Sequence, residues 1–277
     1  MPGRANAAQS NYILGWSDAE QDRLIRQATL LAPMTERLFR EAGIGAGQRV
    51  LDIGSGVGDV AMIAARLVGP SGAVVGIERN ADYIARARER ISALRLRNVT
   101  FIRADLNDVA VTEHFDAAVG RLILTFFSDP VAVLQSVSRL LLPRGVIAII
   151  EPCWSATLAM NASVPLFSRL VTTTHELFRR LGIDTERGVN LFRIFQDAGL
   201  GAPHMHLDME LGHDKVIAEI QAELLRAVQP EAKEHGVSLA ELGDLDTLPD
   251  RINAELLATN SPIAYVAMVS AWSRRGS

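Results

Sequence analysis

The sequence predicts an α/β protein with a seven-stranded, mostly parallel sheet, helices on both faces of the sheet and a helical lid insertion. Two observations predict this fold. From Arg49 to Glu151, short apolar runs alternate with amphipathic segments, which is the pattern of a parallel sheet with covering helices. After Glu151 the alternation gives way to a mostly helical stretch, and two more strand-like runs follow it.

An N-terminal helical cap is expected within residues 1–45. Ser17-Asp18-Ala19-Glu20 has capping-box spacing at the start of this helix, which is predicted to end near Gly43. Between these points the apolar residues recur at helical intervals, as Leu24, Ala28, Leu31 and Leu38.

The core of the sheet is expected within residues 46–152. Its helices are predicted after Gly58, after the capping residue Asn80, and from Asp129-Pro130, where the proline suits a first helical turn. Its five strands are predicted at Val50–Ile53, Ala73–Glu78, Val99–Arg103, Phe115–Gly120 and Val146–Glu151.

The remainder of the chain is predicted to form a lid and the far edge of the sheet. Residues 153–190 are interpreted as the helical lid insertion, and residues 191–277 as the C-terminal part of the core. Two strands are expected there, at His204–Leu211 and Ala264–Trp272, as the antiparallel edge. A helical insertion over residues 213–260 would join them.

Composition excludes several classes of protein. The chain has 277 residues, 48% of them hydrophobic and 22% charged, which is ordinary for a globular protein and excludes a disordered or fibrous one. The net charge of -4 gives no overall cationic field, so nucleic acid is not expected as a partner. The arginines between Arg86 and Arg97 are interpreted as the solvated face of a helix.

Cysteine content and hydropathy indicate the compartment. Cys153 is the only cysteine, so it cannot form an internal disulfide or a zinc knuckle. The first ten residues have no apolar core like that of a signal peptide, and no apolar run approaches the ~18 residues of a membrane span. We expect a cytoplasmic protein with no membrane partner, no metal, and a monomeric or homodimeric state.

The most informative segment runs from Val50 to Asp59, where a buried strand leads into a loop with three alternating glycines and then a helix. Glycines let the backbone approach a ligand closely, and the N–H groups at a helix start bind anionic groups. A tight turn without a ligand is the alternative. The spacing G-x-G-x-G differs from the G-x-G-x-x-G of dinucleotide-binding folds. Asp52, just before the loop, would repel a pyrophosphate and attract a cationic amino group.

Acidic residues also end the next two predicted strands. Glu78 lies 20 residues after Gly58, where a carboxylate can accept hydrogen bonds from both hydroxyls of a ribose. Asp105 follows the third strand, where it can interact with an adenine amino group. A surface position for Glu78 and a helix-capping role for Asp105 are the alternatives.

Together these segments resemble the class I S-adenosylmethionine (SAM) dependent methyltransferases, in particular the small-molecule branch similar to the ubiquinone/menaquinone C-methyltransferases. The resemblance covers residues 50–154. It rests on the glycine loop, on Glu78, on Ala104-Asp105-Leu106, on the strand Phe115 to Arg121, and on Leu142-Pro143-Arg144-Gly145 before the fifth strand. It implies a Rossmann-like fold.

The resemblance also implies SAM as cofactor, S-adenosylhomocysteine (SAH) as product, and a set of cofactor-binding residues. Arg103 to Leu106 would flank the adenine, Gly120 and Arg121 would lie beside the sulfonium, and Tyr12 would fold back onto the methionine part of SAM or merely pack as an aromatic residue. The set is Tyr12, Asp52, Gly54, Ser55, Gly56, Gly58, Glu78, Arg79, Ala104, Asp105, Leu106, Gly120 and Arg121.

The acceptor is expected to be a small, largely apolar or aromatic molecule of secondary metabolism, methylated on carbon or oxygen. The fourth strand ends in Gly120-Arg121-Leu122-Ile123, not in the Asn-Pro-Pro-Tyr type of sequence with which some relatives hold an amide or exocyclic amine. Trp154, Phe167 and Phe178 give the predicted lid an aromatic character, which also fits a plain lid core.

SAM is an activated donor, so the protein mainly has to align the reactants and exclude water. If the acceptor needs a base, the candidates are Glu151, at the end of the fifth strand, and His175, in the lid; purely structural roles are the alternative for both. Arg121 is expected either to anchor an acidic group of the substrate or to pair with an internal acid such as Glu151. His204 and His206 lack a third metal ligand and are interpreted as structural.

Three competing functions remain. A SAM-binding protein of this fold can have a non-methylating role, as a cyclase or a regulator, because fold does not fix function. A nicotinamide-dependent oxidoreductase is disfavoured by the glycine spacing and by Asp52. A purely structural module would need neither the loop nor the ordered acidic residues.

Overall fold

The computed structural model describes residues 14–15, 17–106 and 114–276. Within them a seven-stranded sheet has the order β3-β2-β1-β4-β5-β9-β6. The strands are β1 (Arg49–Ile53), β2 (Ala73–Glu78), β3 (Val99–Arg103), β4 (Phe115–Arg121), β5 (Leu141–Cys153), β6 (His204–Asp208) and β9 (Ala267–Arg274).

The sheet is parallel except for one strand. β1 to β5 pair in parallel, while β9 runs antiparallel to both of its neighbours, β5 and β6. The predicted seven-stranded, mostly parallel sheet and its late antiparallel pairing are therefore confirmed. The order also reverses between β1 and β4, so the carboxyl ends of these strands border the crevice in which open α/β sheets bind ligands.

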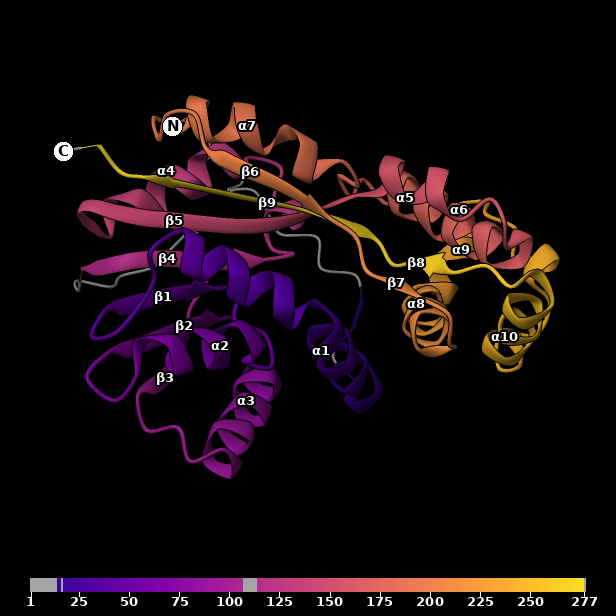
Figure 1. The fold of residues 1–277 in the computed structure, drawn as a ribbon, viewed down its shortest axis with the longest axis horizontal. Helices are drawn as coiled ribbons and strands as arrows, with labels where there is room; N and C mark the ends of the chain where they lie inside the picture. Colours follow the sequence, from indigo (N-terminus) through magenta and orange to yellow (C-terminus); the bar gives the residue numbers. More distant parts are fainter. Residues whose placement is uncertain (1–13, 16, 107–113, 277) are drawn as a thin grey trace, which may run out of the picture.

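Helices cover both faces of the sheet (Figure 1). One face is packed by α1 (Asp18–Glu41), α2 (Asp59–Val68) and α3 (Ala81–Ala93), and the other by α4 (Pro130–Arg139) and α7 (Arg187–Asp197). Their starts follow the predicted capping. Ser17 Oγ accepts the Glu20 N–H, Asn80 Oδ1 accepts the Asp82 and Tyr83 N–H groups, and Asp129 Oδ1 accepts the Ala132 N–H.

A second group of helices gathers beyond the carboxyl ends of β4 and β5, on the right in Figure 1. It comprises α5 (Trp154–Met160), α6 (Pro165–Arg180), α8 (Val216–Ala227), α9 (Gln229–Glu234) and α10 (Leu248–Thr259), together with the short pair β7 (Leu211–Gly212) and β8 (Ile263–Ala264). α1 packs against α8, and Arg26 pairs with Glu223 at 2.5 Å across this contact. We call the helices of this group, which include α5 and α6 of the predicted lid, the lid helices.

Each of the two late strands was predicted to be continuous, but each is divided into two strands in the structure. The run predicted over 204–211 is divided into β6 and β7, and the run predicted over 264–272 into β8 and β9. The Tyr265 N–H donates to the Glu210 carbonyl at 2.8 Å between the two pairs. The chain thus leaves the main sheet at this point to pair with itself beneath the lid, and it brings Tyr265 to the site described below.

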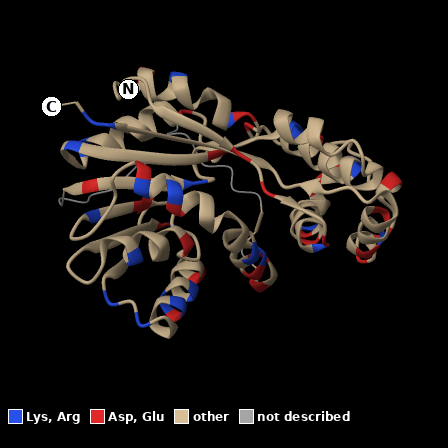
Figure 2. Ribbon diagram, in the orientation of Figure 1, with Lys and Arg blue, Asp and Glu red and all other residues tan. Residues whose placement is uncertain are grey.

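Charged residues of both signs are mixed on the helices, as Figure 2 shows for α1 and α3. The arginines of α3 are not simply a solvated face, contrary to the prediction. The Arg90 guanidinium donates to the Val57 carbonyl at 2.7 Å and to Asp59 Oδ1 at 2.6 Å, and Arg88 donates to the Phe101 carbonyl. Arg90 therefore ties α3 to the glycine loop. Within the described ranges no helix is long and apolar enough to cross a membrane.

Candidate active site

A cavity opens at the carboxyl ends of the parallel strands, where α/β sheets bind their ligands. It encloses about 1410 Å³ of atom-free space, its open mouth included. One half is lined by the segments that follow β1 to β4, including residues 54–57, 78–79, 104–106 and 121–123. The other half is lined by α1, the end of β5, the lid helices and the break between β8 and β9.

The glycine loop has the backbone shape that only glycine adopts easily. Gly54, Gly56 and Gly58 have φ values of 65°, 51° and 89°. A Cβ added at Gly56 would meet no atom within 4 Å, so this position leaves open space beside the cavity. A Cβ at Gly58 would lie 3.1 Å from Ala87 and Phe101. Gly56 thus gives room to a ligand, whereas Gly58 allows close packing.

Glu78 connects the glycine loop to β2. Its carboxylate accepts the Gly56 N–H at 3.0 Å and the Asn80 N–H at 2.8 Å, and its side chain lines the cavity. An ionised carboxylate offers about four acceptor positions, so about two remain for the hydroxyls of a ligand. The hydrogen bonds from the Gly56 and Asn80 N–H groups fix the orientation of the Glu78 carboxylate, and so the direction in which its remaining acceptor positions face.

Asp52 is buried behind the loop and is 1% exposed. Neither of its oxygens has a well-formed hydrogen bond with the described residues. Burial raises the pKa of Asp52 well above its usual value, although Arg121 and the Ala61 backbone N–H act in the opposite direction. A buried carboxylate with so little compensation is favourable only where a cationic group approaches it.

Arg121 ends β4 and lines the cavity. Its guanidinium donates to Thr35 Oγ1 at 2.9 Å. Burial lowers the pKa of Arg121, and the nearby Asp59 and Asp52 raise it. Of the two roles considered for Arg121, the pairing with Glu151 is not observed, because the acids near Arg121 are Asp59 and Asp52. Arg121 thus lines one end of the cofactor half, and the Asp52 carboxyl group is buried behind the same end.

Glu151 has a structural position. It is fully buried, and its carboxylate accepts three backbone N–H groups, from Ile123 at 3.0 Å, Leu124 at 2.7 Å and Thr125 at 3.2 Å. These residues start the short helix η1 (Leu124–Phe126), directly after Leu122, whose φ of 55° is unusual for leucine. Burial raises the pKa of Glu151 to about 7. Glu151 thus holds the turn after β4 and is absent from the residues that line the cavity.

His175 contacts neighbouring side chains and does not line the cavity. Its Nε2 lies 3.0 Å from Thr185 Oγ1, and its ring stacks on Trp154 with centroids 5.7 Å apart. Burial lowers the pKa of His175. Trp154 and Phe178 line the cavity, whereas His175 does not. The geometry therefore supports neither Glu151 nor His175 as a base in contact with the acceptor.

The predicted cofactor residues divide into two groups. Asp52, Gly58 and Gly120 lie behind the cavity wall. At Gly120 an added Cβ would be 2.8 Å from Ile53 Cγ1, so this glycine serves the packing of β4 on β1. Tyr12 lies outside the described residues. The residues that line the cavity are Gly54, Ser55, Gly56, Glu78, Arg79, Ala104, Asp105, Leu106 and Arg121.

Sequence reasoning missed several polar residues of the cavity wall, four of which are Tyr83, Arg23, Gln27 and Tyr265. Tyr83 of α3 donates from its hydroxyl to the Gly15 carbonyl at 3.2 Å and so holds the N-terminal segment beside the cofactor half. The others, Arg23, Gln27 and Tyr265, line the acceptor half. Gln27 lies one helical turn after Arg23, and this spacing was the available signal for those two. Nothing in the sequence pattern marked Tyr265, because it lies within an apolar run.

The comparisons with known proteins identify the family. A family model described as a methyltransferase domain matches residues 44–199, more than half of the chain. The chain belongs to the methyltransferase domain family. This confirms the family that the glycine loop and Glu78 predicted. It also removes the nicotinamide-dependent oxidoreductase as a candidate.

The methyltransferase domain has relatives in sequence and in fold. The ubiquinone/menaquinone biosynthesis C-methyltransferase UbiE of Pseudomonas savastanoi pv. phaseolicola is 32% identical over 150 residues, which are 50% of this chain and 59% of that protein. A putative methyltransferase from Bacillus halodurans has the same fold with a TM-score of 0.58 and 14% identity, over 88% of this chain and 99% of that one. The [4+2]-cyclase SpnF matches with a TM-score of 0.52 and 18% identity, over 88% and 80% of the two chains.

Proposed function

We propose that this methyltransferase-family protein transfers the methyl group of SAM to carbon or oxygen of a small, largely apolar molecule. The main support for this proposal is that the two halves of one cavity have different linings. One half is lined by the glycine loop, Glu78 and Arg121, with the Asp52 carboxyl group buried behind the loop. The other half has mostly aromatic and aliphatic walls.

The cofactor half fits SAM on two independent observations. Gly56 leaves the space that a side chain would fill, and the Asp52 carboxylate is buried without full compensation. In this proposal Asp52 attracts the amino group of the methionine part and Arg121 its carboxylate. Glu78 accepts the ribose hydroxyls, and Ala104 to Leu106 flank the adenine. Bound SAM supplies a methyl group on a sulfonium, which is already activated for transfer.

The acceptor half supports an apolar substrate. Its described walls carry no carboxylate and no imidazole, so the protein's contribution is to orient the acceptor and exclude water. Trp154, held by its stack on His175, contributes from the start of α5, directly after β5. The walls of this half are Leu14, Arg23, Leu24, Gln27, Thr125, Phe126, Phe127, Pro152, Trp154, Phe178, Ile183, Leu224, Tyr265, Val266 and Met268.

The test is methyl transfer itself. Purified protein is incubated with SAM carrying a radiolabelled methyl group and with a panel of aromatic and aliphatic acceptors, and the label extracted into organic solvent is counted. We expect labelled product with at least one acceptor and none with the Gly56→Val variant. SAM binding without label transfer to any acceptor would instead favour the non-methylating function.

The non-methylating function is the second candidate, and one observation favours it. Within the described residues the acceptor half lacks a base, which a ring-forming reaction between neutral groups does not require. SpnF, which shares the fold, is a cyclase. The two candidates make opposite predictions for SAM consumption, because a cyclase would leave SAM unchanged during turnover of its substrate.

A further inference from the structure

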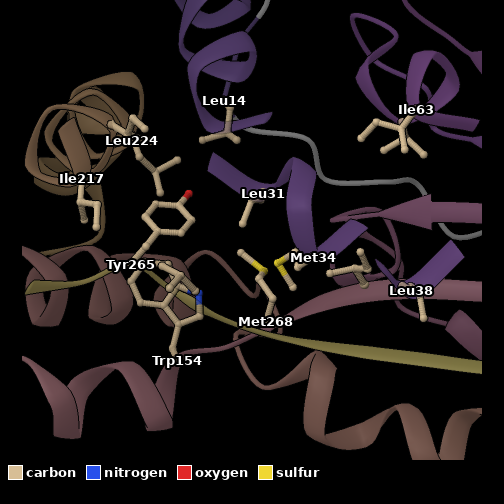
Figure 3. Packing of buried hydrophobic residues seen from close by; sticks show 14 of the residues in the cluster. Leu14, Leu31, Met34, Leu38, Ile63, Trp154, Ile217, Leu224, Tyr265 and Met268 are labelled. Atoms are coloured by element: carbon tan, nitrogen blue, oxygen red, sulfur yellow. The ribbon is translucent and has the colours of Figure 1, made fainter. Parts of the chain in front are cut away.

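Among the described residues, the acceptor half has two hydroxyl groups on a mostly apolar wall, and that of Thr125 already donates to the Asp184 carbonyl at 2.7 Å, which leaves one to consider. It belongs to Tyr265, which is 2% exposed and lies in the break between β8 and β9. The Tyr265 ring packs among Leu224, Trp154 and Leu31, as Figure 3 shows. Leu224, Trp154 and Tyr265 all line the cavity. The sheet break therefore places a phenol beside the space available to the acceptor.

The hydrogen bonds of Tyr265 leave its proton available. The Gln27 amide donates from Nε2 to the Tyr265 hydroxyl oxygen at 2.9 Å. The amide is held in this orientation because its Oε1 accepts from Arg23 Nη1 at 3.2 Å. A tyrosine hydroxyl has one proton to donate, and among the described residues none accepts it. Gln27 thus occupies the oxygen of Tyr265 and leaves the O–H as a donor.

Tyr265 is suited to donate a proton in a hydrogen bond and unsuited to remove one. Burial raises the pKa of Tyr265 above its usual value, although Arg23, Gln27 and Arg121 act in the opposite direction. The phenol therefore stays neutral at physiological pH. It can bind an oxygen on the acceptor but cannot act as a general base there.

The cations near Tyr265 already have acidic partners. The Arg23 guanidinium donates from Nε and Nη2 to the Glu20 carboxylate at 2.7 and 2.6 Å, and both side chains are 2% exposed. Arg121 lies opposite Asp52 and Asp59. A carboxylate on the acceptor would enter this space without an uncommitted cation, and burying an unpaired charge is costly. A hydroxyl or carbonyl carries no such cost.

We propose that Tyr265, oriented by Gln27, donates the hydrogen bond that positions the acceptor by a neutral oxygen, and that the acceptor half selects hydroxyl or carbonyl compounds over carboxylates. This inference rests on the proposed function, because it assigns the second half of the cavity to the acceptor. It makes Arg23, Gln27 and Tyr265 a specificity-determining set that joins α1 to the break between β8 and β9.

The test compares three probes of similar size on SAH-loaded protein by isothermal titration calorimetry: 2-naphthol, 2-methylnaphthalene and 2-naphthoate. We expect 2-naphthol to bind most tightly, by about threefold to tenfold, since a neutral hydrogen bond contributes about 0.5–1.5 kcal/mol. Equal or tighter binding of 2-naphthoate would overturn the proposal, as would the absence of saturable binding by any probe.

Variants test whether the Tyr265 hydroxyl causes the preference for 2-naphthol. Tyr265→Phe removes the donor and should make 2-naphthol and 2-methylnaphthalene bind equally. Gln27→Glu keeps the ring but offers a carboxylate that accepts the Tyr265 proton, so it should abolish the preference too. The control is Thr172→Val, which loses a hydroxyl on the exposed side of α6, outside the cavity, and should keep the preference. A preference that survives both Tyr265→Phe and Gln27→Glu would overturn the assignment.

A measurement of SAH binding distinguishes a failure of this inference from a failure of the proposed function. If SAH does not bind the wild-type protein, the proposed function fails. If SAH binds the wild-type protein and Tyr265→Phe alike but 2-naphthol shows no advantage, only the role of Tyr265 fails.

Discussion

Asp52 illustrates how one residue can serve binding at the expense of stability. Because burial raises its pKa, the ionised side chain destabilises the folded protein as the pH rises above the ordinary value of 3.8. A cationic ligand group would relieve this cost on binding. Natural proteins often keep such uncompensated groups at ligand sites.

For this residue we predict opposite effects on stability and on affinity. At pH 7 the Asp52→Asn variant should melt at a higher temperature than the wild-type protein in the absence of ligand, because folding then no longer buries a carboxyl group whose pKa it must raise. It should also bind SAH at least about tenfold more weakly, which corresponds to ~1.4 kcal/mol. Calorimetry measures both quantities. Asp197→Asn, on the exposed end of α7, is the matched control, and unchanged SAH affinity in Asp52→Asn would contradict the assignment.

Glu151 should make stability depend on pH in a defined direction. Its pKa is raised from 4.5 to about 7 in the folded protein, so the native state holds its proton more tightly than the unfolded chain does. The free energy of unfolding of the wild type, relative to Glu151→Gln, should therefore fall by up to about 3 kcal/mol as the pH rises from about 4.5 to 7. Urea unfolding at several pH values measures this difference, and a difference that is constant or rises with pH is incompatible with a protonated Glu151.

At the scale of elements, the strand bounds show what the sequence could predict. β2 and β3 were predicted residue for residue, because their apolar runs are bounded by Gly72 and Arg79 or by Asn98 and Ala104. β5 begins at Leu141 and not at the predicted Val146, because Leu141 already pairs with Phe115. The pairing is irregular after this point, and the Pro143 and Gly145 of this stretch are not typical of a strand. Tertiary pairing, not local pattern, decides such bounds.

The lid helix α6 should affect the acceptor and not the cofactor. Phe178 of α6 lines the cavity and packs edge-on against Trp154, with ring centroids 5.6 Å apart. Phe178→Leu should cost less than about 1.5 kcal/mol of stability. It should weaken 2-naphthol binding severalfold and leave SAH binding unchanged. Phe192→Leu, on the exposed side of α7 with 46% exposure, controls for the substitution itself. Loss of SAH affinity in Phe178→Leu alone would show that α6 belongs to the cofactor half.

At the scale of the molecule, chain order determined which half of the site could be predicted. The cofactor half comes from short loops after consecutive strands, so Gly54, Glu78 and Asp105 could be located by their distance from predicted strands. The acceptor half joins α1 to segments more than 100 residues away, as in the hydrogen bond between Gln27 and Tyr265. The spacing of residues along the sequence cannot predict a contact between residues so far apart in the chain. For the same reason the sequence left both a base's role and a structural role open for Glu151, which lies two residues before the end of β5, because its three backbone partners come from the turn after β4.

The most direct test of this account is calorimetric titration of the purified protein with SAH. We predict saturable binding at one site, lost in Gly56→Val because a side chain there occupies the space beside the loop. The control is Gly201→Val, since Gly201 has a comparable φ of 73° and open surroundings but lies outside the cavity; this variant should retain binding. Absence of binding in a folded wild-type sample, or undiminished binding in Gly56→Val, would contradict the account.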